Sequence, residues 1–174
     1  MSVSDFVFVI RWWSILFLCG LLFFPFTNKL FSIMPDKGYP FAKVFGILII
    51  SYVIFILSIG PVPFSYFSAI SIATITGLLF FFFDVSITNF QIQVKKTNMS
   101  FITKVWKYVL FEELLFFLTL LFWSYIRLHQ PDIYGLEKYM DVGFVNSILR
   151  SEHFPPKDMW FTPLAINYYY FGHL

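Results

Sequence analysis

Long apolar runs limit this chain to folds that a lipid bilayer can solvate. Four of them, at about residues 6–26, 42–60, 64–83 and 105–126, approach the roughly 20 residues that a helix needs to cross the hydrocarbon core. Of the 174 residues, 59% are hydrophobic and 13% are charged, against about 25% charged in soluble domains. A soluble domain of this size still exposes about a third of the surface of its unfolded chain. The sequence therefore predicts an all-α integral membrane protein with four spans.

The first run has a second interpretation, a cleaved signal peptide. Trp12 and Trp13 near its start are typical of an interface anchor, and the neighbouring Arg11 can reach the headgroups. A signal peptide would have a basic start, a shorter apolar core and small residues at a cleavage site. Here Asp5 precedes the arginine and Pro25 follows the core, so we expect an uncleaved span.

Lysines predict the orientation of the spans, because positive charge in short loops marks the cytoplasmic side. The turn at residues 60–63 has no charge, whereas the loops before and after it are basic. The N-terminus, this turn and residues 127–174 are then expected outside the cell (plasma) membrane. The acceptor pattern for N-glycosylation at Asn98 falls on the cytoplasmic side. The lysines of the two basic loops are Lys29, Lys37 and Lys43 in the first and Lys95, Lys96, Lys104 and Lys107 in the second.

Two acids, Glu112 and Glu113, lie well inside the fourth apolar run. An acid within the membrane is costly and usually faces the protein interior with a partner. Adjacent helical residues point about 100° apart, so we expect at most one of the two to face the interior. A hydrogen bond to a neighbouring helix is one interpretation, and a role with substrate or protons is the other.

Residues 127–174 contain acids, bases, histidines and tyrosines, which are the residue types that could carry out chemistry. Helical spacing runs from Glu137 to about Arg150, and Pro155-Pro156 cannot continue it. Its apolar residues fall on one stripe, which predicts an amphipathic helix lying on the membrane surface. The stripe consists of Met140, Phe144, Val145, Ile148 and Leu149.

The acids of this helix predict a carboxylate at the headgroup plane. Glu137 and Asp141 are four residues apart and share a face, and Asp141 lies at the edge of the apolar stripe. The alternative is a solvated acid whose ion-pair partner is Lys138. Farther on, the run Tyr168-Tyr169-Tyr170 suits either an aromatic belt at the interface or a surface that stacks on a sugar or binds a phosphate.

Three motifs in this segment carry a family resemblance. Gly-Leu-Glu-Lys-Tyr-Met-Asp at 135–141, Phe-Pro-Pro-Lys-Asp-Met-Trp at 154–160 and Ile-Asn-Tyr-Tyr-Tyr-Phe-Gly-His at 166–173 resemble the bacterial and archaeal YYY-motif membrane proteins. Met159 departs from the proline usual there, and residues 162–165 lack an expected glycine. Earlier parts of the same pattern are Gly38-Tyr39, Lys43, Glu113-Leu114-Leu115-Phe116, Arg127 and Pro131-Asp132-Ile133.

That family is similar to the GT-C membrane glycosyltransferases, which take sugars from polyprenyl-phosphate donors at the outer face. The resemblance implies that Asp141 is the catalytic base, with Glu137 as its helper. If a divalent cation such as Mg²⁺ or Mn²⁺ takes part, Asp141 is the residue expected to hold it. The substrate-binding residues that we expect are Lys138, Arg150, Lys157, Asp158, Asn167, Tyr168, Tyr169, Tyr170 and His173.

We therefore expect four spans in residues 1–126 and an extracytoplasmic segment at 127–174, the start of a GT-C-like fold. Family members are much longer, so the chain is expected to be an N-terminal piece, inactive alone, that leads into a further span. The predicted partners are the bilayer and a polyprenyl-phosphate sugar donor, with no nucleic acid. The alternative is a non-enzymatic transporter or assembly scaffold that uses Glu112 and Glu113.

Overall fold

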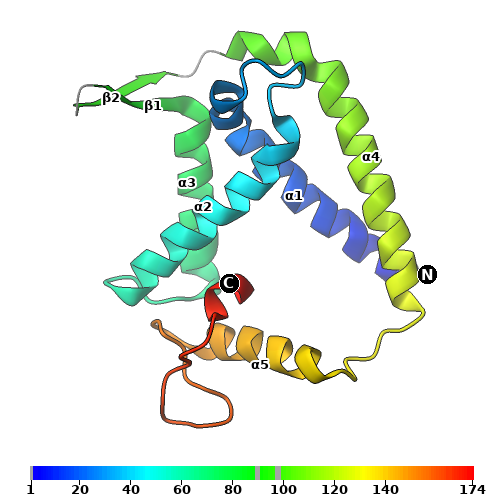
Figure 1. The fold of residues 1–174 in the computed structure, drawn as a ribbon, viewed down its shortest axis with the longest axis vertical. Helices are drawn as coiled ribbons and strands as arrows, with labels where there is room; N and C mark the ends of the chain where they lie inside the picture. Colours follow the sequence, from blue (N-terminus) through cyan, green and yellow to red (C-terminus); the bar gives the residue numbers. More distant parts are fainter. Residues whose placement is uncertain (1, 89–90, 97–98) are drawn as a thin grey trace. The chain divides into compact units, whose positions relative to one another are not determined.

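The computed structural model describes residues 2–88, 91–96 and 99–174 and is helical apart from one hairpin (Figure 1). The chain forms two compact units, one combining the residues up to Ile47 with Gly77–Pro131 and the other combining Leu48–Thr76 with Asp132–Leu174. The long helices are α1 (Val3–Leu30), α2 (Tyr39–Ile59), α3 (Tyr66–Phe82) and α4 (Ile102–Leu128). The later elements are α5 (Leu136–Arg150) and the short 3₁₀ helix η2 (Tyr170–His173).

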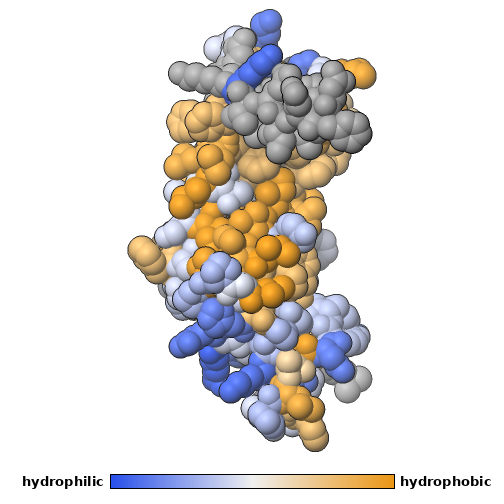
Figure 2. Space-filling view, turned by 90° about the vertical axis from the view of Figure 1, so that its left-hand side faces the viewer, coloured by the Kyte–Doolittle hydropathy of each residue, from blue (hydrophilic) through white to orange (hydrophobic). Residues whose placement is uncertain are grey.

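Three helices of the described chain, α1, α2 and α4, are long and apolar enough to cross a membrane. They have 28, 21 and 27 residues, so each reaches the length that a bilayer core requires. The span predicted at residues 64–83 is the 17-residue helix α3, which is apolar but shorter. Many large apolar side chains on these helices are exposed, and Figure 2 shows hydrophobic surface of this kind in orange.

Helix α1 begins with a capping box that satisfies backbone donors at its N-terminus. Ser2 Oγ accepts from the backbone N–H of Asp5 at 3.2 Å, and the Asp5 carboxylate accepts from the backbone N–H of Ser2 at 2.7 Å. The helix continues through Pro25 to Leu30. It meets α2 where Gly46 has no side chain, since a Cβ there would lie 2.4 Å from Cys19 Sγ. The close approach of α1 and α2 therefore depends on this glycine.

One hairpin, at residues 83–88 and 91–96, interrupts the predicted helical fold. Strand β1 (Phe83–Thr88) pairs antiparallel with β2 (Gln91–Lys96), with Phe83 opposite Lys96, where we expected only a polar loop. Val85, Ile87, Ile92 and Val94 alternate with polar residues in the sequence, which is the pattern of a strand. A short 3₁₀ turn, η1 (Met99–Phe101), then leads into α4, and Asn98 lies outside the described residues.

Helix α5 confirms the helix predicted from Glu137 to Arg150, but its apolar stripe is divided. Phe144 and Ile148 are each 2% exposed, whereas Val145 and Leu149 are 39% and 45% exposed. The ring of Phe144 contacts those of Trp160, Tyr168 and His173 from the following segment. Protein therefore covers part of the stripe that we expected to lie on lipid.

The segment after α5 is attached to the turn between α2 and α3. The backbone N–H of Phe154 donates to the carbonyl of Ser58 at 3.0 Å, and that of Phe64 donates to the carbonyl of Glu152 at 2.5 Å. The rings of Phe55 and Phe64 also lie against Phe154, which is 5% exposed. This attachment fixes the position of residues 152–154 within the second unit.

Candidate functional site

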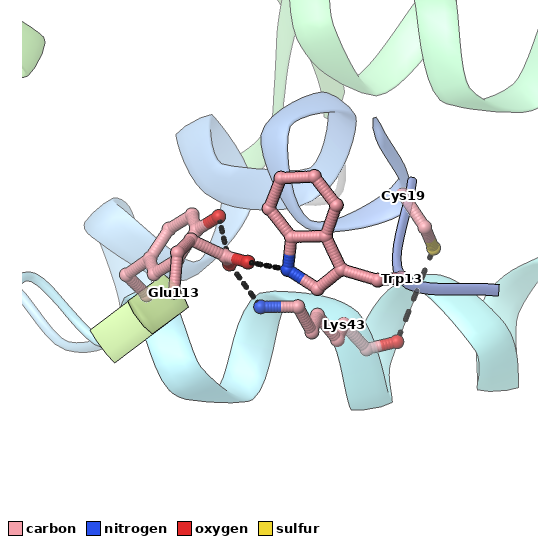
Figure 3. A network of polar contacts seen from close by, with 5 residues as sticks. Trp13, Cys19, Lys43 and Glu113 are labelled. Atoms are coloured by element: carbon pink, nitrogen blue, oxygen red, sulfur yellow. Dashed lines mark hydrogen bonds and ion pairs between the residues drawn. The ribbon is translucent and has the colours of Figure 1, made fainter. Parts of the chain in front are cut away.

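Two carboxylates of this chain have partners from distant parts of the sequence. The first, Glu113, belongs to the unit that contains α1 and α4 and is 4% exposed. One carboxylate oxygen accepts from Trp13 Nε1 at 3.1 Å, and the other accepts from Tyr39 Oη at 2.5 Å and pairs with Lys43 Nζ (Figure 3). The four residues come from α1, α2 and α4, so Glu113 joins three helices.

Lys43 is held from several sides in addition to its ion pair. Its Nζ lies 4.6 Å from the ring centroid of Phe116 and 5.0 Å from that of Tyr39, within the range of cation–π attraction. Its backbone carbonyl faces Cys19 Sγ at 4.0 Å. The predicted loop position of Lys43 is wrong, because α2 begins at Tyr39 and buries this lysine to 8% exposure. Protein groups therefore surround both charged groups of the Lys43–Glu113 pair.

Glu112 differs from its neighbour as expected. It is half-buried and lies beside Asp36 in the loop before α2, and its Oε2 has no hydrogen-bond partner among the described residues. The prediction that only one acid of the pair faces the interior is confirmed, and Glu113 is that acid. Its hydrogen bonds to other helices match the structural interpretation of an intramembrane acid.

The second carboxylate, Asp141, is in the unit that contains α5. Its Oδ1 lies 3.0 Å from Nε2 of His173 in η2, and the two side chains are 48% and 14% exposed, respectively. The ring of His173 packs edge-on against Phe144 and is stacked on Tyr169, and its Nδ1 is buried without a partner among the described residues. A carboxylate that orients an imidazole in this way can assist the transfer of a proton.

The three tyrosines have different environments. Tyr168 and Tyr169 are 52% and 58% exposed, and their ring centroids are 4.0 Å apart. Hydrogen bonding with Tyr168 raises the pKa of Tyr169, so this phenol stays protonated at neutral pH. Tyr170 instead faces Phe55 and Phe154, and burial raises its pKa. Two of the three tyrosines therefore present rings to solvent near Asp141.

The remaining predicted site residues are not part of the contact between Asp141 and His173. The Asp158 carboxylate accepts from the backbone N–H groups of Trp160 and Phe161 at 2.7 and 3.0 Å, which stabilises a turn. That turn is closed by a bridge between Lys157 and Ala165. The described residues contain no group of three or more His, Cys, Asp and Glu that could hold a metal ion. The predicted residues with exposed side chains are Glu137, Lys138, Arg150, Lys157 and Asn167.

Sequence reasoning missed the partners of both acids. The position of Trp13 near the start of an apolar run predicts an interface anchor, whereas in the structure its indole donates to Glu113. Tyr39 and Lys43 belong to the motifs that carry the family resemblance, and this was a signal that they act together. His173 was predicted near a substrate, but its contact with Asp141 joins residues 32 positions apart, which no spacing rule anticipates.

The comparison with protein families gives one match. The model of the family described as uncharacterized membrane protein (DUF2298) matches residues 48–174, which include Glu113, Asp141 and the three tyrosines. Tyr39 and Lys43 precede the matched region. No match was found among the curated proteins or among the solved structures.

Proposed function

Because this chain belongs to the DUF2298 family of membrane proteins, we propose that it forms part of a membrane glycosyltransferase. The enzyme takes a sugar from a polyprenyl-phosphate donor at the outer face of the cell membrane, in the manner of a GT-C-like fold. The contact between Asp141 and His173 carries the proposal. It brings together two residues from separate motifs of the family pattern and leaves the carboxylate half exposed to a substrate.

The proposed step is a displacement at the anomeric carbon of the donor sugar. The hydroxyl oxygen of the acceptor forms the new bond to this carbon, and the bond between the carbon and the phosphate oxygen breaks. The phosphate leaves with the bonding electron pair, and the hydroxyl proton passes to the Asp141–His173 pair. A positioned base of this kind typically contributes about 10²–10⁴-fold to the rate.

Charged and aromatic residues of the same segment suit the two substrates. Phosphate oxygens are stabilised by positive charge, which the exposed Lys138 and Arg150 of α5 and the exposed Lys157 supply. The exposed rings of Tyr168 and Tyr169 offer apolar faces to a sugar, and their hydroxyls offer hydrogen bonds. Glu137, one turn before Asp141, adds negative charge on the same face of the helix.

The proposed topology has α1, α2, α3 and α4 as four spans in residues 1–126, followed by an extracytoplasmic segment at 127–174. Charge in the loops supports an outer location for this segment. The hydrogen bonds that attach residues 152–154 to Ser58 and Phe64 support it too. They hold the segment at the α2–α3 turn, which is the uncharged turn that the same rule assigns to the outside.

Substitution of single acids at the chromosomal locus tests the proposal. We expect Asp141→Asn to reduce glycan output in cells by at least about 100-fold, because the amide cannot accept the proton. Glu152→Gln is the matched control, since it changes an exposed acid of the same segment and is expected to keep normal output. Membrane levels of each variant are measured by immunoblot, so that loss of protein is separated from loss of activity.

The alternative function is a transporter or assembly scaffold that depends on Glu112 and Glu113. The observation that favours it is Glu112 Oε2, which is buried and has no hydrogen-bond partner among the residues that the structure describes. If Asp141→Asn leaves glycan output unchanged while Glu112→Gln or Glu113→Gln abolishes function at normal protein level, the transferase proposal is wrong and the alternative gains support.

A further inference from the structure

The contact between Asp141 and His173 gives the two residues different roles. An ionised carboxylate only accepts hydrogen bonds, so in the 3.0 Å contact Nε2 of His173 carries the hydrogen and donates it to Asp141 Oδ1. We propose that His173 is a positioning residue, which holds the carboxylate so that Asp141 Oδ2, and not the imidazole, takes the proton of the acceptor hydroxyl. This inference rests on the proposed transferase function and names the atom of the pair that receives the proton.

The other ring nitrogen of His173 is closed to a substrate. Nδ1 is buried and has no hydrogen-bond partner among the residues that the structure describes, and the side chain as a whole is 14% exposed. If the hydrogen of the neutral imidazole moved to Nδ1, it would be buried without an acceptor, and Asp141 Oδ1 would lose its donor. The imidazole therefore offers a substrate no accessible lone pair, and the carboxylate is the base.

Aromatic neighbours hold the imidazole in this orientation. The ring of Phe144 packs edge-on against it at 82° with centroids 5.4 Å apart, and the ring of Tyr169 is stacked on it at 19°. Phe144 is 2% exposed and lies three residues after Asp141, on the same face of α5. The backbone N–H of Gly172 donates to the carbonyl of Tyr169 at 3.2 Å, within the turn that brings Tyr169 and His173 together. Both partners of the hydrogen bond are therefore held in place before a substrate binds.

The remaining carboxylate oxygen of Asp141 is the one left for a substrate. The side chain is 48% exposed, and His173 is its one hydrogen-bond partner within the part of the chain that the structure describes. Rotation of a free carboxylate exchanges its two oxygens, whereas a carboxylate held through Oδ1 keeps Oδ2 in one direction. Proton transfer requires the hydroxyl to approach within about 2.6–3.2 Å of the base, so a fixed Oδ2 increases the fraction of bound substrate that can react.

Nitrogen NMR of the chain in lipid nanodiscs at neutral pH, with labelled histidine rings, tests the position of the hydrogen without an assay of activity. We expect the signals of His173, identified by their loss in His173→Gln, to show the hydrogen on Nε2 and a lone pair on Nδ1. Asp141→Ala removes the acceptor and is expected to give a mixture of the two tautomers. Glu152→Ala, at an exposed acid of the same segment, is expected to keep the wild-type signals. A wild-type ring with a hydrogen on Nδ1, or signals that Asp141→Ala leaves unchanged, would overturn the inference.

Glycan output in cells, compared at equal membrane levels of each variant, tests the positioning role. His173→Gln keeps an N–H donor near the position of Nε2, so its output is expected to stay within about threefold of the wild type. His173→Met fills a similar volume without a donor, and its output is expected to fall about 10-fold to 100-fold because the base is misplaced. His129→Met, at an exposed histidine, is the matched control and is expected to keep normal output.

The same assay separates failure of this inference from failure of the proposed function. If Asp141→Asn abolishes output while both His173 variants keep it, or lose it equally, His173 does not act by positioning the acid, and the transferase proposal stands. If Asp141→Asn keeps normal output, the proposed function is wrong and the role of Oδ2 falls with it. The NMR signals would still report whether Nε2 of His173 donates to Asp141.

Discussion

Glu113 and Asp141 are both acids on helices of this membrane protein, but their environments differ. Glu113 is 4% exposed and accepts from Trp13 and Tyr39 while pairing with Lys43. Asp141 has a side chain that is 48% exposed, and its contact is the imidazole of His173. The first carboxylate has its partners within the protein, and the second retains surface that another molecule can reach.

This difference indicates that the two sites make different contributions. A buried charge pair has lost its hydration, so removal of one member leaves the other without compensation. The Asp141–His173 pair is only partly buried and keeps part of its hydration, so it contributes less to folding. We therefore expect substitutions around Glu113 to change the stability of the protein, and substitutions around Asp141 to change what it does.

Lys43→Met is expected to have the largest effect on stability. It leaves the Glu113 carboxylate buried without its counter-charge, which typically lowers the free energy of unfolding by about 3–5 kcal/mol. Unfolding of the purified chain in mixed micelles, followed by tryptophan fluorescence, measures this change. Lys138→Met is the matched control, because that lysine is exposed on α5, and its effect is expected to stay within about 0.5 kcal/mol.

The double variant Lys43→Met with Glu113→Gln tests the reason for the loss. Glutamine carries no charge and keeps one acceptor oxygen for the Trp13 indole, and its NH₂ group can donate to the Tyr39 hydroxyl oxygen, so most of the lost stability is expected to return. If the double variant is less stable than Lys43→Met alone, the loss does not arise from an unpaired charge. The proposed distinction between the buried Lys43–Glu113 pair and the partly exposed Asp141–His173 pair would then be unsupported.

Trp13→Phe is expected to have an intermediate effect. It keeps an aromatic ring beside Phe17 and Phe117 but removes the donor to Glu113. Loss of a hydrogen bond to a charged group typically lowers the free energy of unfolding by about 1.5–3 kcal/mol. The adjacent Trp12→Phe is the control, because Trp12 is 62% exposed and is expected to tolerate the change. Equal effects of the two substitutions in the same unfolding assay would show that the indole bond adds no stability.

The sequence predicted the positions of the long helices and of Glu113 within α4 because both follow from local composition, although α3 is shorter than the predicted span. An apolar run of about 20 residues specifies a membrane helix, and an acid within it must find a partner. The partners themselves were not predictable, since Trp13, Tyr39 and Lys43 are 100, 74 and 70 residues away from Glu113. Such contacts depend on how the helices pack, which their hydropathy does not specify.

Lys43 shows that the rule of positive charge in cytoplasmic loops depends on where each helix begins. It follows Gly38 and Pro40, which suggested a loop, and was counted as a cytoplasmic charge. Proline is tolerated in the first turn of a helix, where its missing N–H has no partner to lose, and α2 begins at Tyr39. The lysine is therefore inside the helix. The β1–β2 hairpin shows the same limit, because its lysines and polar residues are as typical of a loop as its short alternating pattern is of a strand.

Asp141→Ala breaks the contact with His173 but leaves the imidazole packed against Phe144 and Tyr169, so it is expected to have the smallest effect on stability and gives the sharpest contrast with Lys43→Met. The His173–Asp141 contact joins η2 to α5, and its partly exposed acid limits its contribution to less than about 1 kcal/mol. Global unfolding should hardly change, whereas amide hydrogen exchange in residues 170–174 should become about two to five times faster, because this stability is local. His129→Gln, at an exposed histidine that ends α4, is expected to leave that exchange unchanged. A drop in global stability as large as that of Lys43→Met would mean that Asp141 is a structural acid like Glu113, and the reason for placing the chemistry at α5 would be lost.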